Sequence, residues 1–177
     1  MAGHIGDMVS QHWTTPGYLV EAVQCVVGQI GLDPCYNKDS ITDPMFQYSL
    51  PGFDGLKESW AQIGGIPIPN VFCNPPYGRD KERGTSIADW VRKAHDVNVR
   101  AGQTIILLIP AATESSFWFK YIWGSPATMC FLKGRVAFNL GGTKTGSSTR
   151  GSAAVYYGPK PEEFRKVFSE LGAVVHG

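Results

Sequence analysis

The sequence is poor in cysteine, and its few cysteines lack the spacing of a structural framework. Cys25, Cys35, Cys73 and Cys130 are scattered through 177 residues without a C-x-x-C pair. This spacing argues against a disulfide scaffold and against a zinc module. Their apolar neighbours are typical of reduced, partly buried thiols, so we expect a cytoplasmic protein. The four histidines form no cluster with metal-ligand spacing, and no metal is expected.

Long apolar runs and an excess of one charge are also missing. The longest strongly apolar run, at 104–112, is far too short to cross a bilayer, and no N-terminal stretch has the pattern of a secretory signal. The chain has 16 Lys and Arg against 15 Asp and Glu, so no basic field covers the whole molecule. We therefore expect no membrane partner, and a nucleic acid would have to be bound by a local group of cations.

What the sequence does have is an alternation of helical and strand patterns, with 43% apolar residues to form one core. The spacing of Leu19, Val23, Val26 and Ile30 predicts a helix within 14–31 that ends at Gly31. Further helices are expected at 86–102, 114–123 and from 161, and strands at 30–33, 70–73, 103–109, 128–132, 135–139 and 153–157. This alternation predicts a single α/β domain over residues 1–177, with an open, mostly parallel sheet and helices on both faces.

A Gly- and Ser-rich stretch near residues 141–152 interrupts this pattern. Its composition predicts a mobile loop. It is not a phosphate-binding loop of the usual kind, because Gly146 is followed by two serines rather than by Lys and then Ser or Thr.

The strand expected at 70–73 runs directly into Asn74-Pro75-Pro76-Tyr77. The two prolines remove two amide donors and leave their carbonyls as acceptors. The Asn74 side-chain oxygen and the Pro75 carbonyl suit the two hydrogens of an exocyclic amine such as N6 of adenine. Binding both hydrogens draws the nitrogen toward a pyramidal geometry and frees its lone pair for attack on a methyl group. Tyr77 offers a ring for stacking on a base that has left its duplex.

This tetrapeptide matches the (D/N/S)PP(Y/F) motif of amino-methyltransferases that use S-adenosylmethionine. Other matching segments are Trp13-Thr14-Thr15-Pro16, Leu32-Asp33-Pro34, Asp54-Gly55-Leu56 with Trp60, Trp90-Val91-x-Lys93-Ala94, Leu108-Ile109-Pro110 and Gly134-Arg135-Val136-Ala137-Phe138. By this ordered set, the chain resembles the phage-type DNA N6-adenine methyltransferase (Dam-like) family over roughly residues 12–140.

The resemblance implies a Rossmann-like class I methyltransferase fold, S-adenosylmethionine as cofactor and DNA as partner. It also implies a viral or prophage origin and action in a bacterial cytoplasm. Asn74, Pro75, Pro76 and Tyr77 would form the catalytic loop. The implied cofactor-binding residues are Thr15 and Pro16 at the methionine end, Asp33 and Pro34 beside the amino-acid or sulfonium part, and Asp54 and Leu56 at the adenine.

Cations close to the tetrapeptide and in the Gly- and Ser-rich stretch are candidate contacts for DNA phosphates. These are Arg79, Lys81, Arg83, Lys144 and Arg150. A solvated group of charges is the alternative, because Asp80 and Glu82 lie between the first three.

The chain departs from the usual methyltransferase pattern in one respect. The glycine loop D/E-x-x-x-G-x-G that normally follows the first strand is absent after Asp33. Because of this departure, a protein that binds nucleic acid without catalytic turnover stays an alternative. A methyltransferase acting on cytosine N4, on a guanine amine in RNA or on a glutamine amide in a protein also stays open, because each offers a planar NH2 group to the same loop. A nucleotide-binding Rossmann protein is a weaker alternative, since no G-x-G-x-x-G follows the first strand.

Overall fold

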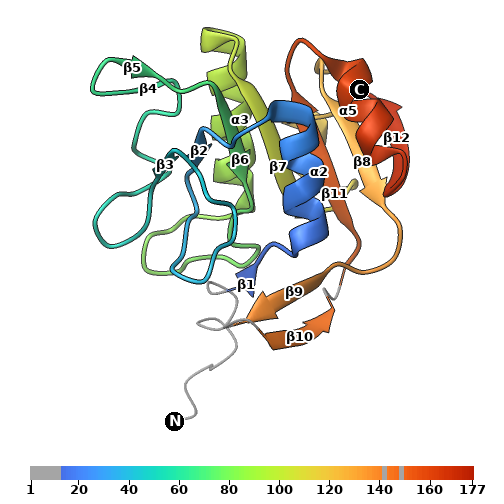
Figure 1. The fold of residues 1–177 in the computed structure, drawn as a ribbon, viewed down its shortest axis with the longest axis horizontal. Helices are drawn as coiled ribbons and strands as arrows, with labels where there is room; N and C mark the ends of the chain where they lie inside the picture. Colours follow the sequence, from blue (N-terminus) through green and yellow to red (C-terminus); the bar gives the residue numbers. More distant parts are fainter. Residues whose placement is uncertain (1–12, 141–142, 148–149) are drawn as a thin grey trace.

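The computed structural model describes residues 13–140, 143–147 and 150–177 (Figure 1). Among these residues, seven strands form the main sheet, in the order β12-β8-β11-β7-β6-β2-β3. Strands β3, β2, β6, β7 and β8 run in one direction and β11 and β12 in the other. The predicted α/β fold with a mostly parallel sheet is confirmed, and it is consistent with the Rossmann-like fold that the resemblance implies.

The strands of this sheet are β2 (Leu32–Asp33), β3 (Phe46–Gln47), β6 (Asn70–Cys73), β7 (Thr104–Pro110), β8 (Thr128–Leu132), β11 (Ser152–Tyr157) and β12 (Gly172–His176). Both β6 and β7 are continuous apolar runs with buried interiors. Such runs are typical of central strands that are covered on both faces.

In the described ranges, four helices cover the sheet, namely α2 (Gly17–Val27), α3 (Ile87–Ala101), α4 (Ser116–Tyr121) and α5 (Pro161–Phe168). Figure 1 shows α2 in front of the sheet and α3 behind it. On one face, α2 and α5 pack on Ile106 and Leu108 of β7. On the other, α3 and α4 pack on Ile105 and Leu107. Because successive side chains of a strand point to opposite faces, β7 contributes to both cores.

Two small sheets accompany the main one in the part of the chain that the structure describes. In one, β1 (Trp13–Thr14), β9 (Ala137–Leu140) and β10 (Thr143–Ser147) pair in antiparallel fashion. In the other, β4 (Gln62–Ile63) pairs with β5 (Ile66–Pro67). The three-stranded sheet lies below the main sheet in Figure 1, at the end to which β8 points. It therefore lies at the edge where parallel strands end, which is where ligands bind in open α/β sheets.

Several predicted boundaries need correction. The first helix ends at Gly28, whose φ of 74° stops it, and not at Gly31. The strand expected at 135–139 is β9 and belongs to the small sheet. Residues 143–147, expected to lie in a mobile loop, form β10, while 141–142 and 148–149 lie outside the described residues. The terminal strand β12 was not predicted.

Other local predictions are confirmed. The helix expected from residue 86 is α3, and Ser86 and Asp89 form a capping box at its start. Gly102 ends that helix with a φ of 64°, and Pro161 opens α5. Over the residues described above, no helix is both long and apolar enough to cross a membrane.

Candidate active site

The loop that follows β6 carries the predicted catalytic tetrapeptide. Its first residue, Asn74, is partly exposed, and its Nδ2 donates a hydrogen bond to Oγ1 of buried Thr15 over 3.1 Å. Thr15 directly follows β1, which pairs with β9. Among the described residues the Asn74 Oδ1 accepts no hydrogen bond. The amide is thus held from one side, and its oxygen stays available as an acceptor.

Tyr77 closes the same loop. Its hydroxyl donates to the carbonyl of Leu108 over 3.3 Å, and its ring meets Phe138 of β9 edge to face, with centroids 5.7 Å apart. Burial raises the pKa of the Tyr77 phenol well above its ordinary value. The hydroxyl therefore stays protonated and acts as an anchor, and the ring packs on the core beside Phe138.

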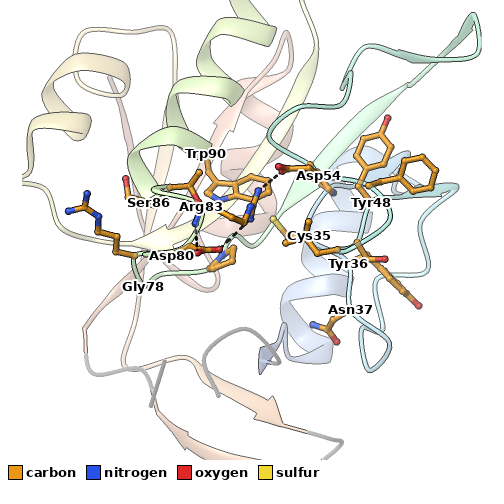
Figure 2. Close-up of a pocket in the computed structure, with 18 of the residues that line it drawn as sticks. Cys35, Tyr36, Asn37, Tyr48, Asp54, Gly78, Asp80, Arg83, Ser86 and Trp90 are labelled. Carbon is orange, nitrogen blue, oxygen red and sulfur yellow. Dashed lines mark hydrogen bonds and ion pairs between the residues drawn. The ribbon is translucent and has the colours of Figure 1, made fainter. Parts of the chain in front are cut away.

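A cavity of about 400 Å³ opens next to this loop, between the segments that follow β2, β3 and β6 (Figure 2). Its apolar wall contains the aromatic side chains Tyr36, Tyr48, Phe53 and Trp90. Its polar groups include Asn37, Ser49, Asp54, Asp80 and Arg83, and Pro76 and Gly78 form its border with the tetrapeptide. A concave, mostly aromatic site with a few placed polar groups is typical of small-molecule binding.

Asp33, at the end of β2, shapes the loop that follows it. Its Oδ1 accepts a hydrogen bond from Cys35 N over 3.0 Å and its Oδ2 from Thr42 Oγ1 over 2.8 Å. Burial raises the pKa of Asp33 to about 6, and these two hydrogen bonds limit the rise. Both carboxylate oxygens are thus committed within the protein. The bond to Cys35 N forms an Asx-turn at the start of the loop after β2.

Asp54 faces the cavity and is already paired. Its Oδ1 lies 2.5 Å from Nη2 of Arg83 and accepts a hydrogen bond from Leu56 N over 3.0 Å, while Oδ2 lies 3.8 Å from Lys57 Nζ. Burial alone would raise the pKa of Asp54, but the hydrogen bonds from Arg83 and Leu56 outweigh it and lower the pKa. Asp54 therefore presents an ionised carboxylate to the cavity at neutral pH.

The glycine in Asp54-Gly55-Leu56 is required by packing. A Cβ at Gly55 would lie 2.1 Å from the carbonyl oxygen of Pro34 and 3.0 Å from the Trp90 ring. The two loops that form the cavity therefore touch through backbone at this point.

The backbone carbonyls of the segment 55–59 are bound by side chains from elsewhere. The Trp60 indole donates to Gly55 O over 2.8 Å, and the Tyr48 hydroxyl donates to Ser59 O over 2.7 Å. Lys93 of α3 donates to Leu56 O over 2.9 Å and to Glu58 O over 2.6 Å. These four bonds fix the segment that carries Asp54.

The structure brings some of the sequence-predicted residues together and separates others. Pro34, Asp54, Pro76, Arg79 and Arg83 line the cavity. Leu56 is partly buried against the core and lines a separate groove beside α3, and Asp33 lies behind the cavity wall. Thr15, Pro16, Asn74 and Tyr77 group at the neighbouring end of β1 and β6.

The candidate DNA contacts fall into three groups. Arg79 and Lys81 are exposed, and so is Arg150. Arg83 is turned toward Asp54 and Asp80. The side chain of Lys144 lies outside the described residues, although its backbone is part of β10.

Sequence reasoning missed most of the cavity wall. Tyr36, Tyr48 and Phe53 follow no periodic pattern, and Trp90 was noted only as part of a segment that matches the family. The one available signal was the concentration of aromatic residues on either side of Asp54. The pair of Arg83 with Asp54 joins residues 29 positions apart and had no signal.

The cavity can bind a planar ligand that carries an amine. The neighbouring loop can place the amine of a second molecule near Asn74. Together they offer carboxylate, amide and carbonyl acceptors beside aromatic rings. Among the residues that the structure describes, no group of His, Cys, Asp and Glu is arranged to hold a metal ion.

Comparison with protein-family models gives a match over most of the chain. Residues 3–170 match the protein-family model described as DNA N-6-adenine-methyltransferase (Dam). Searches of curated proteins and of solved structures gave no match.

Proposed function

The chain belongs to the DNA N-6-adenine-methyltransferase (Dam) family, and from this premise we propose that it transfers a methyl group from S-adenosylmethionine to N6 of an adenine flipped out of DNA. The observation that carries the proposal is the Asn74 amide, which is held through its nitrogen by Thr15 and keeps its oxygen available. An acceptor fixed in this way at the end of β6 is what an amine nucleophile requires.

The cavity fits the cofactor. Its volume of about 400 Å³ is within the range of small-molecule sites, and its aromatic wall with the ionised Asp54 suits an adenine ring that carries N–H donors. Asp54 and the backbone of Pro34 would hold the adenosine part, with Leu56 acting through its amide on Asp54. Thr15 and Pro16 would lie at the methionine end, and Asp33 would hold the shape of the intervening loop.

S-adenosylmethionine supplies a sulfonium-activated methyl group, so the protein needs no acid and no covalent nucleophile. Asn74 Oδ1 and the Pro75 carbonyl accept the two N6 hydrogens and free the nitrogen lone pair. Pro76 keeps the turn rigid because its ring fixes φ. Tyr77, anchored at Leu108, holds the ring of the flipped base at the height of these acceptors.

DNA phosphates would be bound by cations that follow the catalytic loop or lie in the segment before β11. Arg79 and Lys81 directly follow the catalytic loop, Lys144 belongs to β10, and Arg150 lies between β10 and β11. With a net charge of +1, the chain depends on such local groups.

The test is mass analysis of nucleosides from DNA incubated with the protein and S-adenosylmethionine. We expect N6-methyladenine, and we expect Asn74→Ala to lower its formation by at least about a hundredfold at unchanged cofactor affinity, since one of two acceptors is removed. Asn98→Ala, near the C-terminal end of α3, is the matched control and should stay active. N4-methylcytosine as the product, or near-normal N6-methylation by Asn74→Ala, would contradict the proposal. A protein that binds DNA but neither S-adenosylmethionine nor its analogues would be a non-enzymatic member of the family.

A further inference from the structure

Arg83 reaches across the cavity instead of toward solvent. Its guanidinium lies between two carboxylates, with Nη2 2.5 Å from Asp54 Oδ1 and Nη1 3.7 Å from Asp80 Oδ2 (Figure 2). The side chain is only 27% exposed. A guanidinium bracketed by two carboxylates is poorly placed to bind a phosphate outside the cavity, because each pair would have to be broken first.

The backbone around Arg83 is fixed by the same aspartate. Arg83 N donates to Asp80 Oδ1 over 3.0 Å. Asp80 and Thr85 exchange two backbone hydrogen bonds, of 2.9 and 3.1 Å, which close the turn. Gly84, with a φ of 67°, provides the left-handed residue that the turn needs. The guanidinium is therefore presented to Asp54 by a preformed turn.

This turn is continuous with the catalytic loop. Pro76, Gly78, Arg79 and Asp80 all line the cavity, so the chain runs along the cavity wall from the tetrapeptide to Arg83. Through Arg83, this wall is joined by a charged hydrogen bond to the opposite wall, which carries Asp54.

We propose that Arg83 is a positioning residue for the cofactor and not a phosphate contact: it orients the Asp54 carboxylate toward the ligand and ties the cofactor wall to the catalytic loop. The inference rests on the proposed function. It replaces the role in DNA binding that the sequence suggested for this residue, and it leaves that role to Arg79 and Lys81.

The pair also determines how cofactor binding depends on pH. Asp54 faces Arg83 directly, Lys57 at 3.8 Å and Lys93 at longer range, and Asp80 faces Arg83 from the other side. Arg83 is a main reason why the pKa of Asp54 is lowered. Without Arg83, the Asp54 carboxylate should take up a proton at higher pH, and the acid limb of the cofactor-affinity profile should move upward with it.

The experiment measures three properties of Arg83→Gln, Arg83→Lys and the matched variant Lys81→Gln. These are S-adenosylmethionine affinity by calorimetry across a pH range of about 3 to 8, affinity for a DNA duplex without cofactor at several salt concentrations, and thermal unfolding. For Arg83→Gln we expect cofactor affinity to fall about tenfold or more and its acid limb to shift upward, with the salt dependence of DNA binding unchanged. Arg83→Lys should restore part of the affinity, because it keeps the charge but not the planar geometry. Lys81→Gln should show the opposite pattern, with a smaller salt slope and normal cofactor affinity.

Normal cofactor affinity with an unmoved acid limb in Arg83→Gln would overturn the inference, and so would a reduced salt slope like that of Lys81→Gln. If Arg83→Gln does not fold, the same two readouts on Arg83→Lys decide the question. Failure of the wild-type protein to bind S-adenosylmethionine would instead refute the proposed function, which separates the two claims.

Discussion

The two segments that form the candidate site differ in whether their polar groups have hydrogen-bond partners within the protein. In the cofactor wall, formed by 33–35 and 54–60, the carboxylates of Asp33 and Asp54 and the carbonyls around Leu56 are bound by other parts of the protein. In the catalytic loop, Asn74 is bound only through its nitrogen among the described residues, and its oxygen is available. The polar groups of the proposed cofactor wall are bound within the protein, and the oxygen of the residue proposed to act on the substrate is not. This contrast suggests that stability and chemistry depend on different residues, and three further substitutions test it.

The largest effect is expected at Asp33, in the satisfied wall. Burial raises the pKa of its carboxyl to about 6, so the folded state holds this proton more tightly than the unfolded state does. The stabilisation from this group is therefore present below about pH 4 and is lost as pH rises through about 6, which amounts to on the order of 3 kcal/mol. We call this fall in the free energy of unfolding with rising pH the alkaline limb. Asp33→Asn should remove the limb from a series of urea unfolding curves between about pH 4 and 8.

The Asp33→Asn variant should fold, because an asparagine side chain at this position can still accept the bond from Cys35 N. Its amide nitrogen can donate to the Thr42 hydroxyl, which can turn toward Ser40 Oγ at 2.9 Å. Asp39→Asn, on the same loop, is the control and should retain the limb. A limb of unchanged size in Asp33→Asn would show that the buried carboxylate is not its source.

The second effect concerns the catalytic loop. Thr15→Val removes the hydroxyl that accepts the Asn74 amide, while it keeps the shape of the side chain. We expect turnover to fall roughly thirtyfold, equivalent to about 2 kcal/mol, with little change in unfolding, because the amide can then rotate. Thr15→Ser keeps the hydroxyl and should be close to wild type. Equal turnover of Thr15→Val and the wild type in a steady-state methylation assay would show that the Thr15 hydroxyl does not orient the Asn74 amide.

The third and smallest effect returns to the cofactor wall. Lys93→Met removes two hydrogen bonds to carbonyls, at Leu56 and Glu58, and should destabilise the fold by about 1.5 kcal/mol. Cofactor affinity should fall in parallel, whereas turnover at saturating cofactor should not. Lys57→Met is the matched control, because the Lys57 side chain is 82% exposed and its Nζ lies 3.8 Å from Asp54 Oδ2, which makes a weak ion pair. Identical urea midpoints for the two variants would show that Lys93 does not fix the segment.

The sequence was most informative where one local pattern determines the outcome. The strands β6 and β7, the start of α3 near Ser86 and the position of the tetrapeptide at the end of β6 were all predicted, since each depends on neighbouring residues. The helix that ends at Gly28 was predicted too long, because Ile30 continues its apolar spacing although it belongs to the core beyond the helix.

Features that depend on residues far apart in the chain were not predicted. The bond between Asn74 and Thr15 joins residues 59 positions apart, and Lys93 meets Glu58 across 35. The absent glycine loop looked like a defect in the sequence. In the structure the Asp33 side chain holds the start of the loop after β2 through Cys35 N, a contact that no sequence pattern indicated.

The position of Thr15 has a consequence for synthesis on the ribosome. Thr14 and Trp13 pair with Asn139 and Leu140, which emerge about 125 residues later. Until β9 has been made, nothing in this pairing holds Thr15 beside Asn74, so a nascent chain with a complete cofactor wall would still lack an ordered amide. Contacts at such separations form late and slowly in folding. If the proposed function holds, newly made protein would become able to modify DNA only as the last quarter of the chain folds.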